Sequence, residues 1–330
     1  MSASLNAHHG YADPGLARAL ERTGDLAERL SLRDTLMDAL VGLWSSRFVS
    51  GNIAAAHALA TRAVAIADGA PVLDGLSGQA HFAYAGSALT LGMPATARQH
   101  FELACARSAD EESLSTGSHP AIHARAWSAH AAWLLGDRHL AEAHATEAVE
   151  RARSVDHPYS LAIALAYAGL TRQLLGDVAG LETATDELAR LGSRHGFAYY
   201  PAWGLVLSGW ARDDDAGTAR IERGLADLRA AGAFARMPYW LSLLAERSPD
   251  PDRARAVLDA AVVAARVRED RWWLPEVLRA RATRFATGAE AAEGVRAALD
   301  LALEHGSVAL AERCRADLAS PRTPAERPPP

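Results

Sequence analysis

The stretch AWLLGDRHLAEAHATEA (residues 132–148) decides the fold, because it combines a helix end, a tight turn and a second helix. The turn glycine, Gly136, is followed at offsets of five and twelve by Ala141 and Ala148. Glycine ends a helix where the backbone must become left-handed, and small residues let the second helix pack closely on its neighbours. The stretch therefore predicts a helical hairpin.

The same spacing occurs twice upstream, which indicates an internal repeat. The earlier copies are Gly51 with Ala56 and Ala63, and Gly92 with Ala97 and Ala104. A fourth turn, at Gly176, continues the repeat with Leu181 and Leu188 in place of the alanines. Later the glycine is lost, but alanine pairs seven apart persist at Ala254/Ala261 and Ala291/Ala298. The period resembles that of the tetratricopeptide repeat, a helix–turn–helix unit of about 34 residues, lengthened here to about 40.

The rest of the chain shows the same helical periodicity, with apolar residues at i, i+3, i+4 and i+7. We expect an all-α, tetratricopeptide-like right-handed α-solenoid of about seven helical hairpins across residues 33–306. One helix near Pro14–Leu30 precedes them and one near Ser307–Leu318 follows. Such hairpins bury their apolar faces by stacking, which predicts a single domain over residues 13–319. Residues 1–12 and the Pro-rich tail, residues 320–330, are predicted to be disordered.

Composition narrows the possible partners and location. The 330 residues carry a net charge of −6, and all 34 basic residues are arginine. A net-acidic chain makes a nucleic-acid partner unfavourable, and no apolar run is long enough for a membrane span. Two cysteines, Cys105 and Cys314, cannot build a disulfide framework, which favours the reducing cytoplasm.

Several short segments, in order along the chain, carry a family resemblance. They are Gly42-Leu43-Trp44, residues 132–136 (AWLLG), residues 157–162 (HPYSLA), Gly209-Trp210-Ala211, residues 238–246 (PYWLSLLAE), and Arg271-Trp272-Trp273 with Glu276. This series resembles the C-terminal helical-repeat region of large bacterial signalling ATPases that are fused to nucleotide-cyclase, kinase or transcription-regulator modules. The resemblance implies a sensing or docking module separated from its effector.

Two segments depart from that family pattern. His119-Pro120-Ala121 stands where the family tends to have Asp-Pro-Gly, and Leu274-Pro275 replaces a Glu-Ala pair. These changes put in doubt any ligand contact made at either place. No segment resembles the ATPase, cyclase or DNA-binding parts, and a chain without lysine cannot form a Walker loop.

Motifs for catalysis, metals or cofactors are absent from the sequence. It has no G-x-S-x-G, HExxH or CxxC, so we expect no catalytic residue, metal or cofactor. Histidine is the one suggestive cluster, because His119, His123 and His130 can share a helix face. Three interpretations are open: a zinc site, polar groups in an exposed groove, or partly buried, hydrogen-bonded histidines.

Counting back from the turn glycines gives residues of the first helix in the second, third and fourth hairpins that face the concave surface, and aromatic residues of the second half are added to them. The resulting ligand-binding candidates are Gln79, Phe82, His123, His130, Trp133 and Gln173 from the counting, and Tyr200, Trp203, Trp240 and Trp273 from the second half. Tryptophan offers a large contact area with a donor at its edge, which suits an anchoring contact. For Trp133, Trp203 and Trp240 core packing and ligand contact are equally plausible interpretations, whereas Trp44 and Trp210 are assigned to the core.

These observations favour a non-enzymatic binding or regulatory module. Its concave face is expected to recognise a peptide, a partner protein or a small-molecule effector. An alternative is an enzyme or auxiliary protein of bacterial secondary metabolism, with a closed pocket around His123, His130, Trp133 and Tyr200. A third hypothesis is a regulator fragment without a ligand of its own.

Overall fold

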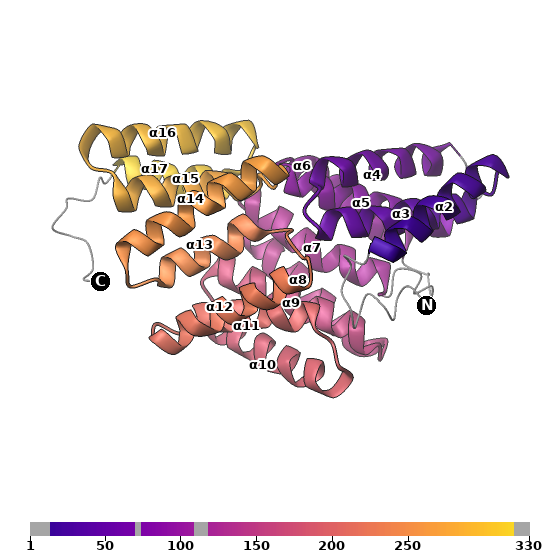
Figure 1. Ribbon diagram of the computed structural model, residues 1–330, viewed down its shortest axis with the longest axis horizontal. Helices are drawn as coiled ribbons and strands as arrows, with labels where there is room; N and C mark the ends of the chain where they lie inside the picture. The colour runs from indigo at the N-terminus through magenta and orange to yellow at the C-terminus, as the bar shows by residue number, and fades with distance from the viewer. Residues whose placement is uncertain (1–13, 70–73, 109–117, 320–330) are drawn as a thin grey trace.

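The computed structural model describes residues 14–69, 74–108 and 118–319, and these form sixteen α-helices and no strand. Helix α2 (Pro14–Arg29) comes first and α17 (Val308–Ala319) comes last (Figure 1). Between them lie seven hairpins: α3 (Arg33–Val49) with α4 (Ile53–Asp68), α5 (Asp74–Thr90) with α6 (Pro94–Arg107), α7 (Pro120–Leu134) with α8 (Arg138–Ser154), α9 (Pro158–Leu175) with α10 (Val178–His195), α11 (Tyr199–Trp210) with α12 (Asp215–Ala230), α13 (Met237–Arg247) with α14 (Pro251–Arg268), and α15 (Leu274–Phe285) with α16 (Gly288–Glu304). The predicted fold class and hairpin register are confirmed, while the segments predicted to be disordered lie outside the described residues.

The repeated glycines and alanines have the roles that their spacing predicts. Gly51, Gly92 and Gly136 have φ angles of +78°, +92° and +88°, which places them in the left-handed region. Ala141 and Ala148, the small residues that follow Gly136, are 0% exposed. Glycine therefore ends the first helix of each of these hairpins, and the small side chains bring the second helix close to its neighbours.

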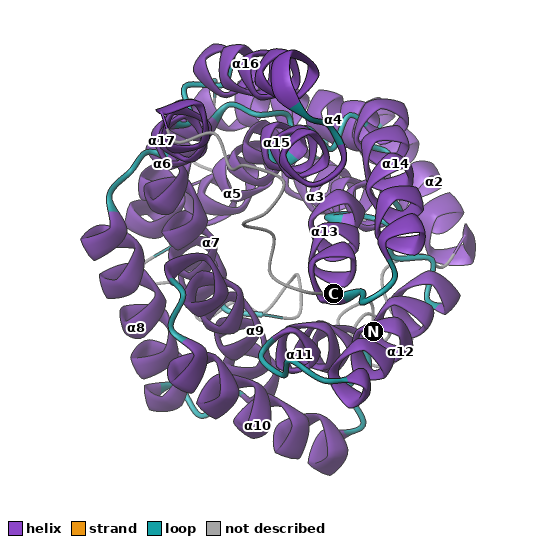
Figure 2. Ribbon diagram, turned by 90° about the vertical axis from the view of Figure 1, so that its left-hand side faces the viewer, coloured by secondary structure: helices purple, strands orange, loops and turns teal. Residues whose placement is uncertain are grey.

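The hairpins form two concentric layers around the superhelix axis. Figure 2 shows the first helices of the hairpins, α3, α5, α7, α9, α11, α13 and α15, on the inside and the second helices on the outside. The inner helices are rich in large aromatic side chains, whereas small buried alanines occur in both layers. The inner layer is therefore where a ligand would meet side chains that differ from one hairpin to the next.

The superhelix completes a turn, so that late hairpins lie against early ones. The backbone N–H of Phe234, in the α12–α13 loop, donates to the carbonyl of Val49 at 2.8 Å. One hairpin further on, the N–H of Arg271, in the α14–α15 loop, donates to the carbonyl of Thr90 at 2.8 Å. We call the contacts between the first three hairpin turns and the α12–α13, α14–α15 and α16–α17 loops the seam.

The turn glycines of the first three hairpins lie at this seam. A Cβ atom on each would approach a residue of the following superhelical turn: Arg268 Nη1 at 2.8 Å for Gly51, the His305 ring at 2.8 Å for Gly92, and Val308 Cγ1 at 2.9 Å for Gly136. A Cβ on Gly176 would meet no described atom within 4 Å. Glycine thus serves two purposes at the first three turns, a left-handed backbone and room for the seam.

None of the described helices is long and apolar enough to cross a membrane.

Candidate ligand site inside the superhelix

Aromatic side chains form a continuous chain along the inner layer. It begins at Phe82 on α5, whose ring centroid lies 4.5 Å from that of His123 on α7. It passes through Tyr167 on α9 to Trp203 on α11, whose centroids are 5.2 Å apart. Further contacts are Trp203–Trp240 at 5.2 Å, Tyr239–Trp240 at 4.8 Å, Tyr239–Trp273 at 5.1 Å and Trp133–Trp273 at 5.9 Å. We call this set the aromatic chain.

The residues predicted to bind ligand lie mostly in or against the aromatic chain, and most are buried. His130 stacks on Tyr167, with ring centroids 5.2 Å apart, and Gln173 accepts a 2.7 Å hydrogen bond from the Tyr239 hydroxyl. Gln79 is buried one turn before Phe82 on α5. Those with at most 6% of their surface exposed are Gln79, Phe82, His130, Trp133, Tyr200, Trp203, Trp240 and Trp273. These side chains are therefore buried inside the protein and do not line an open groove.

The five tryptophans that the sequence analysis assigned to the core or left open between core and ligand contact are all buried. Trp44 and Trp210 are 4% and 8% exposed, in agreement with their assignment to the core. Trp133, Trp203 and Trp240, for which both interpretations were open, are at most 1% exposed. They pack like core residues while also belonging to the inner wall.

Arg236 is the most unusual residue of the interior, and sequence analysis did not identify it. Its side chain is 3% exposed, and its guanidinium carbon lies 4.4 Å from the ring centroid of Trp127 and 4.7 Å from that of Trp203. Tyr167 and Phe48 also lie within cation–π range, at 5.2 Å and 5.8 Å. Arg236 Nη2 donates to the Tyr167 hydroxyl at 3.0 Å. A fixed positive charge therefore lies inside a cage of aromatic rings.

The backbone around Arg236 is held in a strained conformation by the seam. Its φ of +62° lies in the left-handed region, which a non-glycine residue adopts at a cost of about 1 kcal/mol. Asp270, 0% exposed in the α14–α15 loop, accepts the Arg236 N–H at Oδ2 over 2.6 Å. The neighbouring N–H of Ala235 donates to the carbonyl of Val49 at 3.1 Å. Strain held in place by surrounding contacts is characteristic of functional sites.

Burial decides the charge state of the groups around this arginine. Desolvation, together with the nearby Arg236 charge, lowers the pKa values of His123 and His130 to about 3, so both imidazoles are neutral at pH 7. His130 Nε2 lies 3.2 Å from the Tyr167 carbonyl oxygen, and His123 Nε2 lies 3.3 Å from the Tyr167 hydroxyl. Desolvation raises the pKa of Asp270 to about 7. Of the three interpretations of the histidines, buried hydrogen bonding describes His130.

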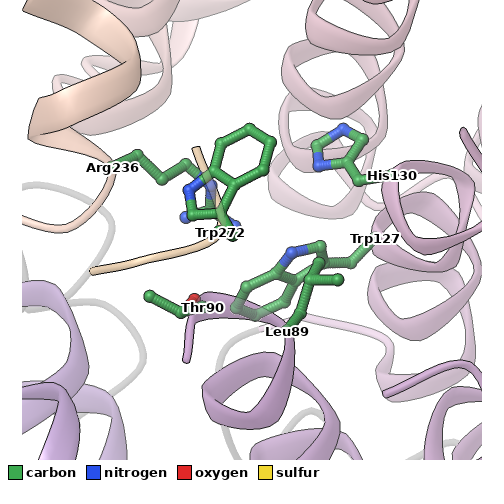
Figure 3. A pocket seen from close by; sticks show the side chains of 6 residues that line it. All are labelled: Leu89, Thr90, Trp127, His130, Arg236 and Trp272. Atoms are coloured by element: carbon green, nitrogen blue, oxygen red, sulfur yellow. The ribbon is translucent and has the colours of Figure 1, made fainter. Parts of the chain in front are cut away.

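A narrow crevice adjoins the guanidinium. Figure 3 shows its lining from both sides of the seam, with α5 and α7 on one side and the α12–α13 and α14–α15 loops on the other. The lining residues are Leu89, Thr90, Trp127, His130, Arg236 and Trp272. Because the crevice is too narrow for a water molecule, a ligand of any size must widen it. No group of three or more His, Cys, Asp and Glu that could hold a metal occurs among the described residues.

Two of the missed residues left a signal in the sequence. Trp127 and Tyr167 each lie nine residues before a turn glycine, Gly136 and Gly176. Trp127 also lies between His123 and His130 on one face of α7. The same counting procedure could have found both, whereas Arg236 follows no turn glycine of the repeat.

Comparison with known proteins gives a fold likeness and one partial relative. No family model matches the chain. An uncharacterized protein of Rhizobium meliloti (strain 1021) is 26% identical over 194 residues, which cover 56% of this chain and 19% of that protein. The chain thus spans about a fifth of the length of the curated relative it matches. The crystal structure of a Rap protein complexed with Competence and Sporulation Factor superposes with a TM-score of 0.56 and 14% identity, covering 86% of this chain and 77% of that one. The fold is a tetratricopeptide-like right-handed helical solenoid.

Proposed function

We propose that this chain is a non-enzymatic binding module whose inner wall recognises a peptide, a partner protein or a small effector and thereby regulates a separate component. The observation that carries the proposal is the buried Arg236 in its aromatic cage, next to a crevice lined by both sides of the seam. A ligand that enters there changes contacts between hairpins that are distant in sequence. Residues 13–319 act as one domain in this proposal.

A fold likeness and a sequence resemblance support the proposal. A Rap protein of similar fold was crystallised in complex with Competence and Sporulation Factor, so this architecture accommodates a bound factor. The residues shared with the helical-repeat region of bacterial signalling ATPases favour a sensing role in a bacterial regulator. In this proposal the chain performs that role for an effector on another polypeptide.

The histidine environment favours binding over proton transfer. A general base works best with a pKa near the operating pH, whereas the pKa values of His123 and His130 are lowered to about 3. Both imidazoles also have Tyr167 as a hydrogen-bonding partner, which holds their rings in place. These features suit a rigid recognition wall.

Thermal-shift screening of the purified chain against peptides and small effectors tests the proposal. We expect at least one compound to raise the melting temperature, and Trp127→Leu to abolish that shift. Trp210→Leu is the matched control, because Trp210 is a buried tryptophan that does not line the crevice. Turnover of a metabolite by the purified chain alone would contradict a non-enzymatic role, and equal effects of the two variants would place binding elsewhere.

A further inference from the structure

We infer that the ligand of this module carries a carboxylate beside an aromatic or apolar group, and that Arg236 is its counter-ion. The inference rests on the proposed function and specifies the chemistry of what the interior recognises. It is carried by the hydrogen bonding and surroundings of the Arg236 guanidinium.

The first step is that Arg236 lacks an anionic partner. A guanidinium has five N–H donors, and a buried arginine is normally paired with a carboxylate. Among the described residues the guanidinium of Arg236 forms no ion pair within 4 Å, and its hydrogen bond goes to the neutral Tyr167 hydroxyl. The buried carboxyl Asp270 bonds through Oδ2 to the backbone N–H of Arg236. The Arg236 charge acts on the Asp270 carboxyl electrostatically, but no carboxylate of the described residues is ion-paired with the guanidinium.

The second step is an excess of hydrogen-bond donors in the same wall. The indole Nε1 atoms of Trp203 and Trp240 are buried and have no hydrogen-bond partner in the described part of the chain, as is also true of Trp44, Trp133 and Trp210. An unpaired buried donor is costly, so a ligand rich in acceptor oxygens complements this wall. A carboxylate supplies those oxygens and the missing negative charge together.

The third step is the surroundings of the guanidinium. Its carbon lies 4.4 Å from the ring centroid of Trp127 and 4.7 Å from that of Trp203, so aromatic rings surround the charge. A guanidinium presents its N–H groups in its own plane, where a carboxylate forms two parallel hydrogen bonds. The surrounding rings, together with Leu89 in the crevice, contact whatever group adjoins the carboxylate. That neighbouring group is therefore aromatic or apolar.

The fourth step is access. One side of the crevice is held to the other by backbone hydrogen bonds, which include those from Phe234 to Val49 and from Trp272 to Thr90 at 3.0 Å. A ligand reaches Arg236 only when this part of the seam separates. Binding is thus coupled to the contact between early and late hairpins, and amide hydrogen exchange at residues 231–236 reports it.

Two matched pairs of probes test the inference on the full chain and separate two sources of a carboxylate. Phenylacetate is compared with phenylacetamide, and the peptide Ala-Ala-Phe with its C-terminal amide, by tryptophan fluorescence and calorimetry. We expect an acid to bind at least about tenfold more tightly than its amide. A preference confined to the first pair identifies a free acid, and one confined to the second identifies a peptide C-terminus.

Variants then assign the preference to Arg236. Arg236→Gln is expected to remove the difference between acid and amide, and Arg236→Lys to retain part of it. Arg247→Gln is the matched control, since Arg247 lies on α13, 5.0 Å from the ring centroid of Trp210, and is ion-paired with Asp213 at 3.2 Å. Circular dichroism checks that each variant is folded.

The wild-type comparison decides the inference even if Arg236→Gln fails to fold. Equal affinities within both pairs, or no saturable binding of either acid below about 10 mM, would overturn it. The inference would also be overturned if compounds without a carboxylate raised the melting temperature and Trp127→Leu abolished that rise. The proposed binding function would then still hold. Failure of the proposed function gives a different result, namely no shift from any compound.

Discussion

Gly136 and Val308 are packed so closely that a Cβ atom on the glycine would lie 2.9 Å from Cγ1 and 3.3 Å from Cβ of the valine. Val308 begins α17, the last described helix, whereas Gly136 ends the third hairpin's first helix. A hydrogen bond of 3.4 Å from Ser307 Oγ to the carbonyl of Leu134 joins the same two segments. The end of the superhelix is thus fitted to the turn of an early repeat.

Because of this fit, replacing glycine by alanine should lower the free energy of unfolding by different amounts at two equivalent turn positions. Gly176→Ala is expected to lower the free energy of unfolding by about 1 kcal/mol, the strain of a left-handed alanine. Gly136→Ala adds the overlap with Val308, for a total of about 2–3 kcal/mol. Urea unfolding measures both values. Val308→Ala in the Gly136→Ala background should recover part of the loss, and equal losses at the two glycines would argue against the seam.

Asp270 should make the chain more stable as the solution becomes acidic. Burial raises its folded pKa from the ordinary 3.8 to about 7, so the folded state binds the proton more tightly than the unfolded state. From pH 8 to pH 5 this group should add about 3 kcal/mol to the free energy of unfolding. Asp270→Asn should remove that gain, as followed by urea unfolding across the range. An unchanged pH dependence would show that the carboxyl is not desolvated.

His130 should make the folded chain less stable as the pH falls, which is opposite to the effect of Asp270. Its folded pKa is lowered to about 3, so protonation of the unfolded chain near pH 6.5 destabilises the folded state as the pH falls. The cost from pH 8 to pH 5 is about 2 kcal/mol, and His130→Asn should remove it. His139→Asn is the control, because His139 is exposed on α8. If both variants changed the pH dependence of the unfolding free energy to a similar extent, the lowered pKa of His130 would not be its cause.

A buried ionic cluster joins α15 to α17. Glu276 is 8% exposed and pairs with Arg279 at 2.7 Å and Arg313 at 3.1 Å. Glu276→Ala removes one of the two carboxylates that pair with Arg279, which keeps its pair with Asp317, so the free energy of unfolding should fall by about 1–3 kcal/mol. Glu187→Ala breaks the pair with Arg153 on the outer surface and should cost less than about 1 kcal/mol. Chemical denaturation of both variants checks the contrast.

The hairpins were predictable because each depends on local chemistry. A left-handed turn needs glycine and a close helix pair needs alanine, so Gly51, Gly92 and Gly136 set the register without any distant contact. Counting from these turns placed Phe82 and Trp133 on the inner wall, and the aromatic residues of the second half added Trp203 and Trp240. Their burial and the position of Arg236 were not predictable in this way, because both depend on the superhelix meeting itself. The bond from Arg236 to Asp270 joins two separate loops, and no spacing within one repeat encodes it.

The seam also affects how the chain is completed during synthesis. The first three turns emerge early from the ribosome, but their partners lie within residues 234–308. Until those residues emerge, the nascent hairpins can stack locally while Trp127 and its neighbours lack the cover that Arg236 and Trp272 provide. Contacts that join distant parts of a chain form late and slowly. The aromatic interior is therefore assembled only after residue 308 has emerged.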